Sequence, residues 1–303
     1  MSNVAIRTTR ETMAATLATG RSKDRSPRSM VFLATLWFSL FFGIMVLLAL
    51  IIDTAITGAP RLDTNLLFGH ESTLRRNETG FRAGILGSVW LMATTALMTV
   101  PLGIAAAVYL EEFANQKTWY NKLVEVNLQN LAAVPAIIYG MLAAAIMGLL
   151  GYNYKGIVLG GAIALGLLIL PVVIITTREA IRAVPQEIRQ GSLALGATVW
   201  QTTWRNTLPS AVPGIATGTI LGLSRAIGEA APLLILGLAT VRFDPTSVES
   251  KVTALPLQIY NLAGQPQEEY EIAASAAIIV LLVMILGMNA LAIFIRNKFQ
   301  RSW

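Results

Sequence analysis

The sequence predicts an all-α integral membrane protein with six transmembrane helices. The 303 residues are 54% hydrophobic and only 13% charged, whereas soluble domains average about 25% charged residues. The apolar residues gather into long runs, and a helix of about 20 such residues crosses roughly 30 Å of hydrocarbon. Polar segments that carry most of the charge separate the runs. The six predicted spans are 30–52, 84–110, 128–150, 156–176, 212–240 and 272–295.

The first span follows a polar tail, residues 1–29, that is rich in Ser, Thr and Arg. We expect this tail to be disordered and cytoplasmic. The basic region and the apolar run 30–52 are both too long for a typical cleaved signal peptide, so an uncleaved helix is expected. The following segment, 53–82, carries charges of both signs and is expected to have little fixed structure. It contains His70, the one histidine of the chain, which we expect to be solvated.

The second span, 84–110, ends at the acidic pair Glu111-Glu112, which is expected to be a solvated helix end. The third and fourth spans, 128–150 and 156–176, are joined by a short turn and should form a helical hairpin. Prolines inside spans remove backbone hydrogen bonds and kink helices. These kinks fit either a passive role in shaping the bundle or a protein that rearranges. The prolines are Pro101, Pro135, Pro171 and Pro232.

The distribution of positive charge predicts the orientation. With a cytoplasmic N-terminus, the inside segments hold 15 Lys and Arg residues and the outside segments hold 7. Such an excess favours both termini on the cytoplasmic side. The net charge of +6 is scattered around the spans instead of forming one patch, which argues against nucleic-acid binding.

The fifth span, 212–240, contains Arg225 and Glu229. A charge at the centre of a membrane helix costs roughly 2.5 to 3.5 kcal/mol even on lenient scales. One interpretation is a polar pathway for an anion, because a guanidinium group suits oxyanions. The other is an ion pair that only allows two charges to be buried. On a helical wheel both charges fall on a glycine stripe, where another helix packs most closely. The stripe consists of Gly214, Gly218 and Gly222.

The polar segment 177–211 is too hydrophilic to span, yet it is patterned. Pro185 suits the first turn of a short helix, Gly196 a turn, and Leu208-Pro209 the end of a second helix. Such a compact knob on the cytoplasmic side could dock on a soluble partner. It could equally lie on the bilayer, with Trp200 and Trp204 as anchors.

The segment resembles the cytoplasmic loop of ABC-transporter permeases, in which Glu-Ala-Ala, three residues, Gly and nine further residues precede Ile-x-Leu-Pro. Gly196 and Leu208-Pro209 match that pattern. Gln190-Gly191-Ser192 stands in place of Glu-Ala-Ala, and Asn206 in place of Ile. Residues 79–298 resemble phosphate ABC permeases, and the A type (PstA family) in particular. The segments that carry this resemblance include ETGFRAGILGSVW, VPLGIAAAVYLEEFA, LAAVPAIIYGML and RAIGEAAPLLILG.

The resemblance implies a type I ABC importer bundle, with residues 83–298 as the permease domain and 177–211 as its coupling loop. It implies four kinds of partner: a C-type permease, two copies of a cytoplasmic ATPase, an external phosphate-binding protein and the bilayer of the cell (inner) membrane. The chain lacks a Gly-x-x-x-x-Gly-Lys-Ser/Thr motif, so we expect no enzyme activity and no cofactor, with ATP and Mg²⁺ bound by the ATPase. Arg225 and Glu229 would line the phosphate pathway. The residues expected to couple to the ATPase are Gln190, Gly191, Ser192, Leu195, Gly196, Ala197, Leu208 and Pro209.

One competing interpretation is an ion-coupled secondary transporter or channel for an oxyanion. It would account for the intramembrane charges but not for the loop 177–211. The dependence of uptake on ATP separates the two interpretations.

Overall fold

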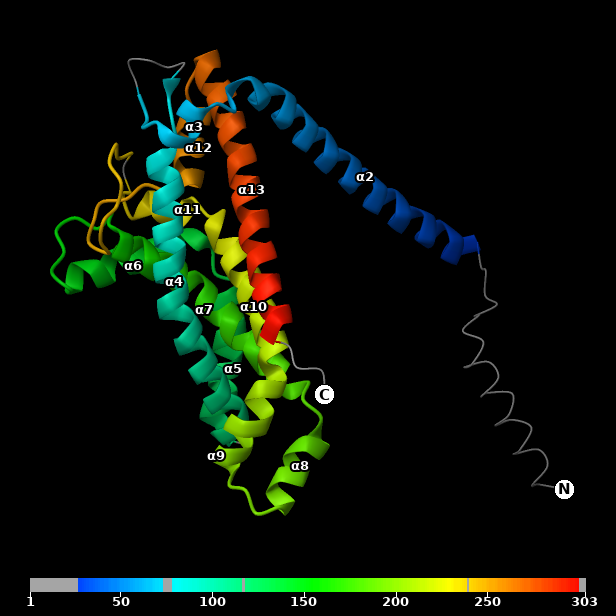
Figure 1. Ribbon diagram of the computed structural model, residues 1–303. Coiled ribbons are helices and arrows are strands. Elements are labelled where there is room, and N and C mark those ends of the chain that lie inside the picture. Colours follow the sequence, from blue (N-terminus) through cyan, green and yellow to red (C-terminus); the bar gives the residue numbers. More distant parts are fainter. Residues whose placement is uncertain (1–26, 73–77, 116–117, 239, 300–303) are drawn as a thin grey trace. The chain divides into compact units, whose positions relative to one another are not determined.

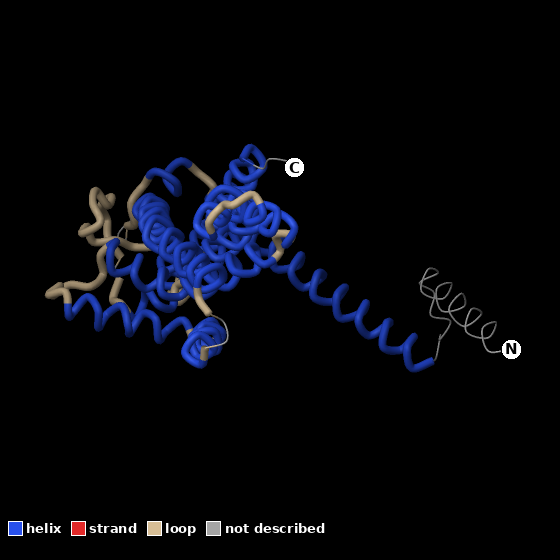
Figure 2. Tube along the Cα trace, turned by 90° about the horizontal axis from the view of Figure 1, so that it is seen from below, coloured by secondary structure: helices blue, strands red, loops and turns tan. Residues whose placement is uncertain are grey.

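The computed structural model describes residues 27–72, 78–115, 118–238 and 240–299. It divides the chain into two compact units, Met1–Asp53 and Thr54–Trp303. Residues 1–26, most of the predicted disordered tail, lie outside the described residues. Most of the described residues are helical, and Figure 2 draws helices and loops but no strand among them. Their one β-type pairing is an isolated bridge between Ile157 and Lys251. The prediction of an all-α fold is therefore confirmed.

The first predicted span forms helix α2, Pro27–Gly58. The segment after it is more ordered than expected, so the prediction of little fixed structure over 53–82 is wrong for residues 59–68, while residues 73–77 lie outside the described residues. A short 3-10 turn, Ala59–Arg61, and helix α3, Thr64–Phe68, follow α2. The side chain of Asp63 accepts a 2.7 Å hydrogen bond from the backbone N–H of Leu66, which is a regular helix N-cap.

The second unit is a helical bundle. Helices α4, α7, α10 and α13 run alongside one another, with α8 and α9 at one end of this unit and α3 and α12 at the other (Figure 1). We call these the α8 end and the α12 end. The helices are α4 (Arg82–Val108), α5 (Trp119–Ala132), α6 (Ala136–Leu149), α7 (Val158–Arg182), α8 (Gln186–Ala194), α9 (Val199–Thr202), α10 (Leu208–Ile227), α11 (Ala231–Ile235), α12 (Leu255–Ala263) and α13 (Glu268–Phe299). Two π-helical turns, Tyr109–Phe113 and Thr203–Thr207, extend α4 and join α9 to α10.

Four of the described helices are long and apolar enough to cross a membrane: residues 29–61, 82–113, 158–182 and 268–298. Helices α5 and α6 form a fifth span only as a bent pair, with an angle of 109° between them. The prediction of six continuous spans is therefore wrong for 128–150 and 212–240. Pro135 stands immediately before α6 and cannot donate the hydrogen bond that would continue α5. The fifth predicted span stops at Ile227 and resumes as α11, whose first turn contains Pro232.

The largest core cluster lies where α4, α7 and α11 meet. Leu91, Ile169 and Leu233 are almost fully buried in it. Small residues let these helices approach closely, which is how membrane helices gain packing energy in the absence of a strong hydrophobic drive. The bundle thus places the two broken segments against its most densely packed helix, α7.

Candidate functional site

Arg225 lies in the last turn of α10, and Glu229 lies in the break that follows. Arg225 Nε is 3.7 Å from Glu229 Oε1, and the side chains are 49% and 27% exposed. The two side chains form an ion pair, but the distance between these two atoms is too long for a hydrogen bond. The expectation that both charges share one buried helix face is wrong, because the helix ends at Ile227 and Glu229 is not on it. A cation in the last turn is also favoured by the helix dipole.

The glycine stripe of α10 faces α7. A Cβ added to Gly218 would lie 2.2 Å from Thr176 Oγ1, and one added to Gly214 would lie 2.7 Å from the Cβ of Ala180. At Gly222 the nearest atom, on Val173, would be 3.7 Å away. The glycines therefore allow the two helices to touch, and Arg225 follows three residues after the last of them.

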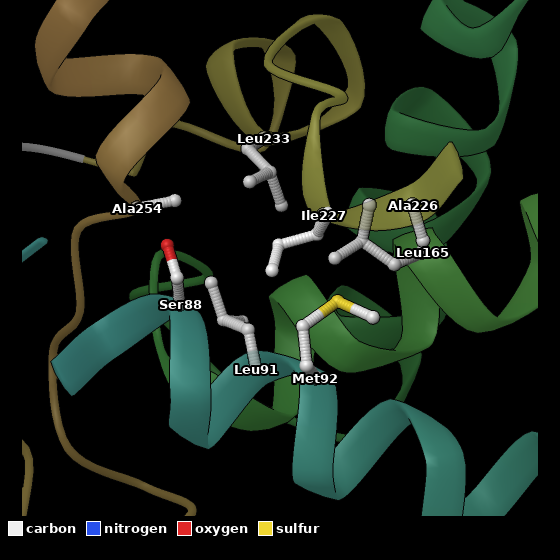
Figure 3. Close-up of a pocket in the computed structure, with 8 residues that line it drawn as sticks. All are labelled: Ser88, Leu91, Met92, Leu165, Ala226, Ile227, Leu233 and Ala254. Carbon is white, nitrogen blue, oxygen red and sulfur yellow. The ribbon is translucent and has the colours of Figure 1, made fainter. Parts of the chain in front are cut away.

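A small cavity lies beside the break between α10 and α11 (Figure 3). Ser88 is its one polar lining side chain, and the Ser88 hydroxyl already accepts a 2.9 Å hydrogen bond from the backbone N–H of Leu255. With an uncharged lining, this cavity is a packing defect next to the break and not an anion site. Its lining residues are Ser88, Leu91, Met92, Leu165, Ala226, Ile227, Leu233 and Ala254.

At the α8 end, residues 186–202 form a helical knob made of α8, a turn and α9. Gly196 has φ +85°, a left-handed conformation that a residue with a Cβ adopts only at a cost. Leu195, at the tip, is 90% exposed. Gln190 and Gly191 are exposed on α8, and Ala197 is half-buried. The knob thus presents an apolar tip on a tight turn.

The second helical piece does not end at Leu208-Pro209, as the sequence predicts. Helix α9, the π turn Thr203–Thr207 and α10 follow one another without interruption, with Pro209 in the first turn of α10. Leu208 packs against a small core that includes Val108 and Ile181, while Pro209 is exposed. The Leu-Pro pair thus marks where the knob joins α10.

Ser192 in the knob is hydrogen-bonded to Asn206 in the π turn Thr203–Thr207. The Asn206 side-chain amide donates to Ser192 Oγ at 2.9 Å. Ser192 Oγ is also 3.0 Å from Thr202 Oγ1. This polar contact fastens α8 to the π turn that leads into α10.

A cluster of opposite charges, which the sequence analysis did not pair, lies at the same end of the bundle. Glu111 Oε1 accepts a hydrogen bond from Arg182 Nε at 2.7 Å, and Glu111 Oε2 accepts one from Arg178 Nε at 3.2 Å. Glu111 is 7% exposed and Arg178 is 9% exposed. Glu125 on α5 lies 3.4 Å from Arg178. The expectation of a solvated acidic helix end is therefore wrong.

Glu112 forms a separate pair with the knob. Its Oε1 lies 3.0 Å from Arg189 Nη1 on α8, and Arg189 also donates a 2.5 Å hydrogen bond to the carbonyl of Ile181. Phe113 contacts Trp200 of α9, with ring centroids 5.8 Å apart. Two adjacent acids at the end of one span, with arginines beyond the end of another, are the signal that points to this cluster.

The α12 end carries a second set of charged contacts. Arg82, at the start of α4, donates to Asp244 Oδ2 from Nη2 at 2.7 Å, and His70 Nε2 lies 3.4 Å from Asp244 Oδ1. Hydrogen bonds from Arg82 lower the pKa of Asp244. His70 therefore has an acidic partner, and its side chain is 39% exposed. The expectation of a merely solvated histidine is wrong.

Comparison with known proteins shows a family, and individual relatives, whose sequences are similar to this one. The family described as "Binding-protein-dependent transport system inner membrane component" matches residues 99–301. The chain is 29% identical over 289 residues to the phosphate transport system permease protein PstA of Yersinia pestis, covering 94% of this chain and 97% of that protein. It is 30% identical over 276 residues to the protein of the same name from Pasteurella multocida, covering 89% and 95% respectively.

Solved structures of bacterial ABC transporters share the fold. A chain of the transporter that imports the acidic polysaccharide alginate has a TM-score of 0.65 at 18% identity, covering 91% of this chain and 98% of that one. A chain of a bacterial alginate ABC transporter in complex with an alginate pentasaccharide-bound periplasmic protein gives a TM-score of 0.66 at 19% identity, covering 91% of this chain and 97% of that one. These likenesses concern the fold, and they confirm the predicted ABC-importer bundle.

Proposed function

The chain belongs to the family of binding-protein-dependent transport system inner membrane components, among the A-type phosphate permeases, and on that premise we propose that it is a transmembrane subunit of an ATP-driven importer for inorganic phosphate. The observation that carries the proposal is the similarity over nearly the whole chain to phosphate permeases. The chain itself is a multi-pass membrane protein and a transport subunit.

The knob supports coupling to an ATPase in a partner chain. The sequence holds no phosphate-binding loop motif, so the energy source has to be another protein. Leu195 at the exposed tip and Gly196 at the turn give the knob a shape that a groove on a cytoplasmic ATPase could hold. Movement of the knob would then reorient α7 and α10, to which it is directly joined.

Two further kinds of partner, besides the ATPase, complete the proposal. A C-type permease would form the pathway together with this chain, and two ATPase copies would bind ATP and Mg²⁺. An external binding protein would deliver phosphate, as the periplasmic protein in the alginate transporter complex suggests by analogy. The charge distribution supports a cell-membrane orientation with both termini in the cytoplasm.

Arg225 is the residue proposed to face phosphate. Phosphate carries between one and two negative charges near neutral pH, and its passage through hydrocarbon needs a nearby cation. The Arg225 side chain is half exposed on the surface of this single chain, where a second permease could complete a polar pathway. Its loose contact with Glu229, at 3.7 Å, suits a site that must release its cargo.

The test uses the complete complex, reconstituted in liposomes with its binding protein. We expect Arg225→Gln to lower ATP-dependent phosphate uptake by about tenfold, the equivalent of one charge-assisted hydrogen bond, and Arg225→Lys to retain part of it. Glu229→Gln should alter uptake as well. Normal uptake by both Gln variants would leave the pair a structural role only, and absence of ATP-dependent phosphate uptake by the wild-type complex would overturn the proposed function.

A further inference from the structure

The knob is joined by the chain to α7 and α10 but not to α4, and yet α4 touches it at two places. Both contacts come from the π-helical turn Tyr109–Phe113. Glu112 pairs with Arg189 on α8 at 3.0 Å, and the ring of Phe113 packs at a tilt of 44° against Trp200 on α9, with 5.8 Å between ring centroids. We propose that Glu112 and Arg189, supported by Phe113 and Trp200, are positioning residues that couple α4 to the movement of the knob. This inference rests on the proposed function.

The Glu112–Arg189 pair is sufficiently buried to transmit movement between α8 and the π turn that extends α4. Glu112 is 8% exposed and Arg189 is 24% exposed, so solvent screens the pair less than it screens an ion pair in water. Breaking such a pair is costly, because the remaining charge stays buried without its partner. Arg189 also holds the Ile181 carbonyl in the last turns of α7 at 2.5 Å. One guanidinium therefore joins α8 to α4 and α7 together.

The π turn separates two acids that follow each other in sequence. Glu111 binds Arg178 and Arg182 of α7, at 3.2 and 2.7 Å, while Glu112 binds Arg189 of the knob. Consecutive residues on a helix point about 100° apart, so a single turn can hold two neighbours at once. π-helical turns inside longer helices occur frequently at functional sites. Here the turn directs Glu111 toward α7 and Glu112 toward the knob.

The consequence reaches the opposite end of the bundle. Helix α4 runs over 27 residues from Arg82 to Val108, which is about 40 Å at 1.5 Å per residue. At its far end Arg82 holds Asp244. A displacement of the knob that pulls the π turn would therefore reach the α12 end through one continuous helix, in addition to the routes through α7 and α10.

The experiment compares single substitutions with a charge exchange in the reconstituted complex. Glu112→Gln and Arg189→Gln should leave the complex assembled and able to hydrolyse ATP, while phosphate uptake falls by at least about fivefold, the lower end of typical coupling between sites. The exchange, Glu112→Arg combined with Arg189→Glu, should recover most of the uptake. Lys122→Gln removes an exposed cation on the neighbouring helix α5 and serves as the control with normal uptake.

A distance measurement separates positioning from general stability. The natural chain contains no cysteine, so spin labels can be attached at Tyr109→Cys and Glu187→Cys alone. In the wild-type background the distance between the labels should stay constant between nucleotide-free and ATP-trapped states, because the π turn and α8 move together. In Glu112→Gln it should change between the two states.

Several outcomes would overturn the inference. Normal uptake by both single variants would do so, as would a label distance in Glu112→Gln that behaves as in the wild type. If removal of either charge prevents assembly, Phe113→Leu and Trp200→Leu test the second contact, and uptake unchanged by both would be equally decisive. Lack of ATP-dependent uptake by the wild-type complex would instead refute the proposed function, so the two failures can be told apart.

Discussion

Asn206 donates a 2.9 Å hydrogen bond from its side-chain amide to the hydroxyl of Ser192. These are two of the positions at which the loop departs from the ABC-permease pattern, which has alanine and isoleucine there. The pair holds α8 against the π turn Thr203–Thr207. A polar contact thus stands where the pattern predicts an apolar one, and the two departures are related to each other.

The first prediction concerns this pair. Ser192→Ala or Asn206→Ile alone should each destabilise the knob by about 1 kcal/mol, the usual net value of one hydrogen bond. The double variant should lose less than the sum of the two, because it replaces both polar partners together. The apparent midpoint of thermal unfolding in detergent measures this. Strictly additive losses would show that the bond contributes no coupling energy.

The second prediction concerns the turn at the tip of the knob. Gly196→Val should weaken co-purification with the ATPase, because φ +85° costs a residue with a Cβ roughly 1–2 kcal/mol. Gly196→Asn is the matched control, since asparagine tolerates this backbone conformation better than valine. Equal recovery of the ATPase by wild type, Asn and Val variants would contradict the docking role of the turn.

The third prediction concerns the contact between α7 and α10. Gly218→Ala places a Cβ 2.2 Å from Thr176 Oγ1, and such overpacking typically costs about 1–3 kcal/mol. Gly222→Ala is the comparison, because its nearest neighbour would be 3.7 Å away, an ordinary contact. The unfolding midpoint should fall clearly for the first variant and hardly for the second. A similar midpoint for both would mean that the helices separate without penalty.

The fourth prediction concerns pH at the α12 end. Burial raises the pKa of Glu71 above 4.5, although Gln258 donates a 3.0 Å hydrogen bond to it. The folded protein therefore holds this proton more tightly than the unfolded chain, so the contribution of Glu71 to stability is present below pH 4.5 and is lost as pH rises through the folded pKa. Glu71→Gln should raise the unfolding midpoint near neutral pH.

The pH dependence of that effect is the control. The difference between Glu71→Gln and wild type should shrink toward zero below pH 4.5, where both states of the wild type are protonated. The variant keeps an acceptor for Gln258, so loss of the hydrogen bond does not confuse the result. A difference that is constant with pH, or that has the opposite sign at pH 7, would contradict this account.

Long apolar runs made most of the fold predictable. Helices α2 and α13 cover their predicted spans, and α4 and α7 each fall short of theirs by two residues at one end, because a run of about twenty apolar residues leaves few alternatives to a membrane helix. Proline at position 135 indicated a kink, but the bend of 109° between α5 and α6 depends on what each half packs against. The same holds for the break after Ile227, which a helical wheel cannot represent.

The charged contacts were less predictable, because they join segments far apart in the sequence. Glu111 and Arg178 are separated by 67 positions, and only the packing of α4 on α7 brings them together. Arg225 stood out in the sequence because it is alone among apolar residues. The pairing of Glu112 with Arg189 did not stand out, because each lies in a polar segment where a charge is ordinary. Local composition therefore reveals isolated charges more readily than paired ones.

The π turn at Thr203–Thr207 determines how far α10 is rotated about its own axis relative to the knob. In this turn the N–H of Leu208 reaches the carbonyl of Thr203, one residue more than in an α-helical turn. Removing a single residue here would rotate α10 by about 100° and carry Arg225 to a different side of the bundle. Reactivity of a cysteine placed at position 225 would report that rotation. An insertion or deletion in this stretch should therefore disturb the orientation of α10, although loops between helices usually tolerate changes of length.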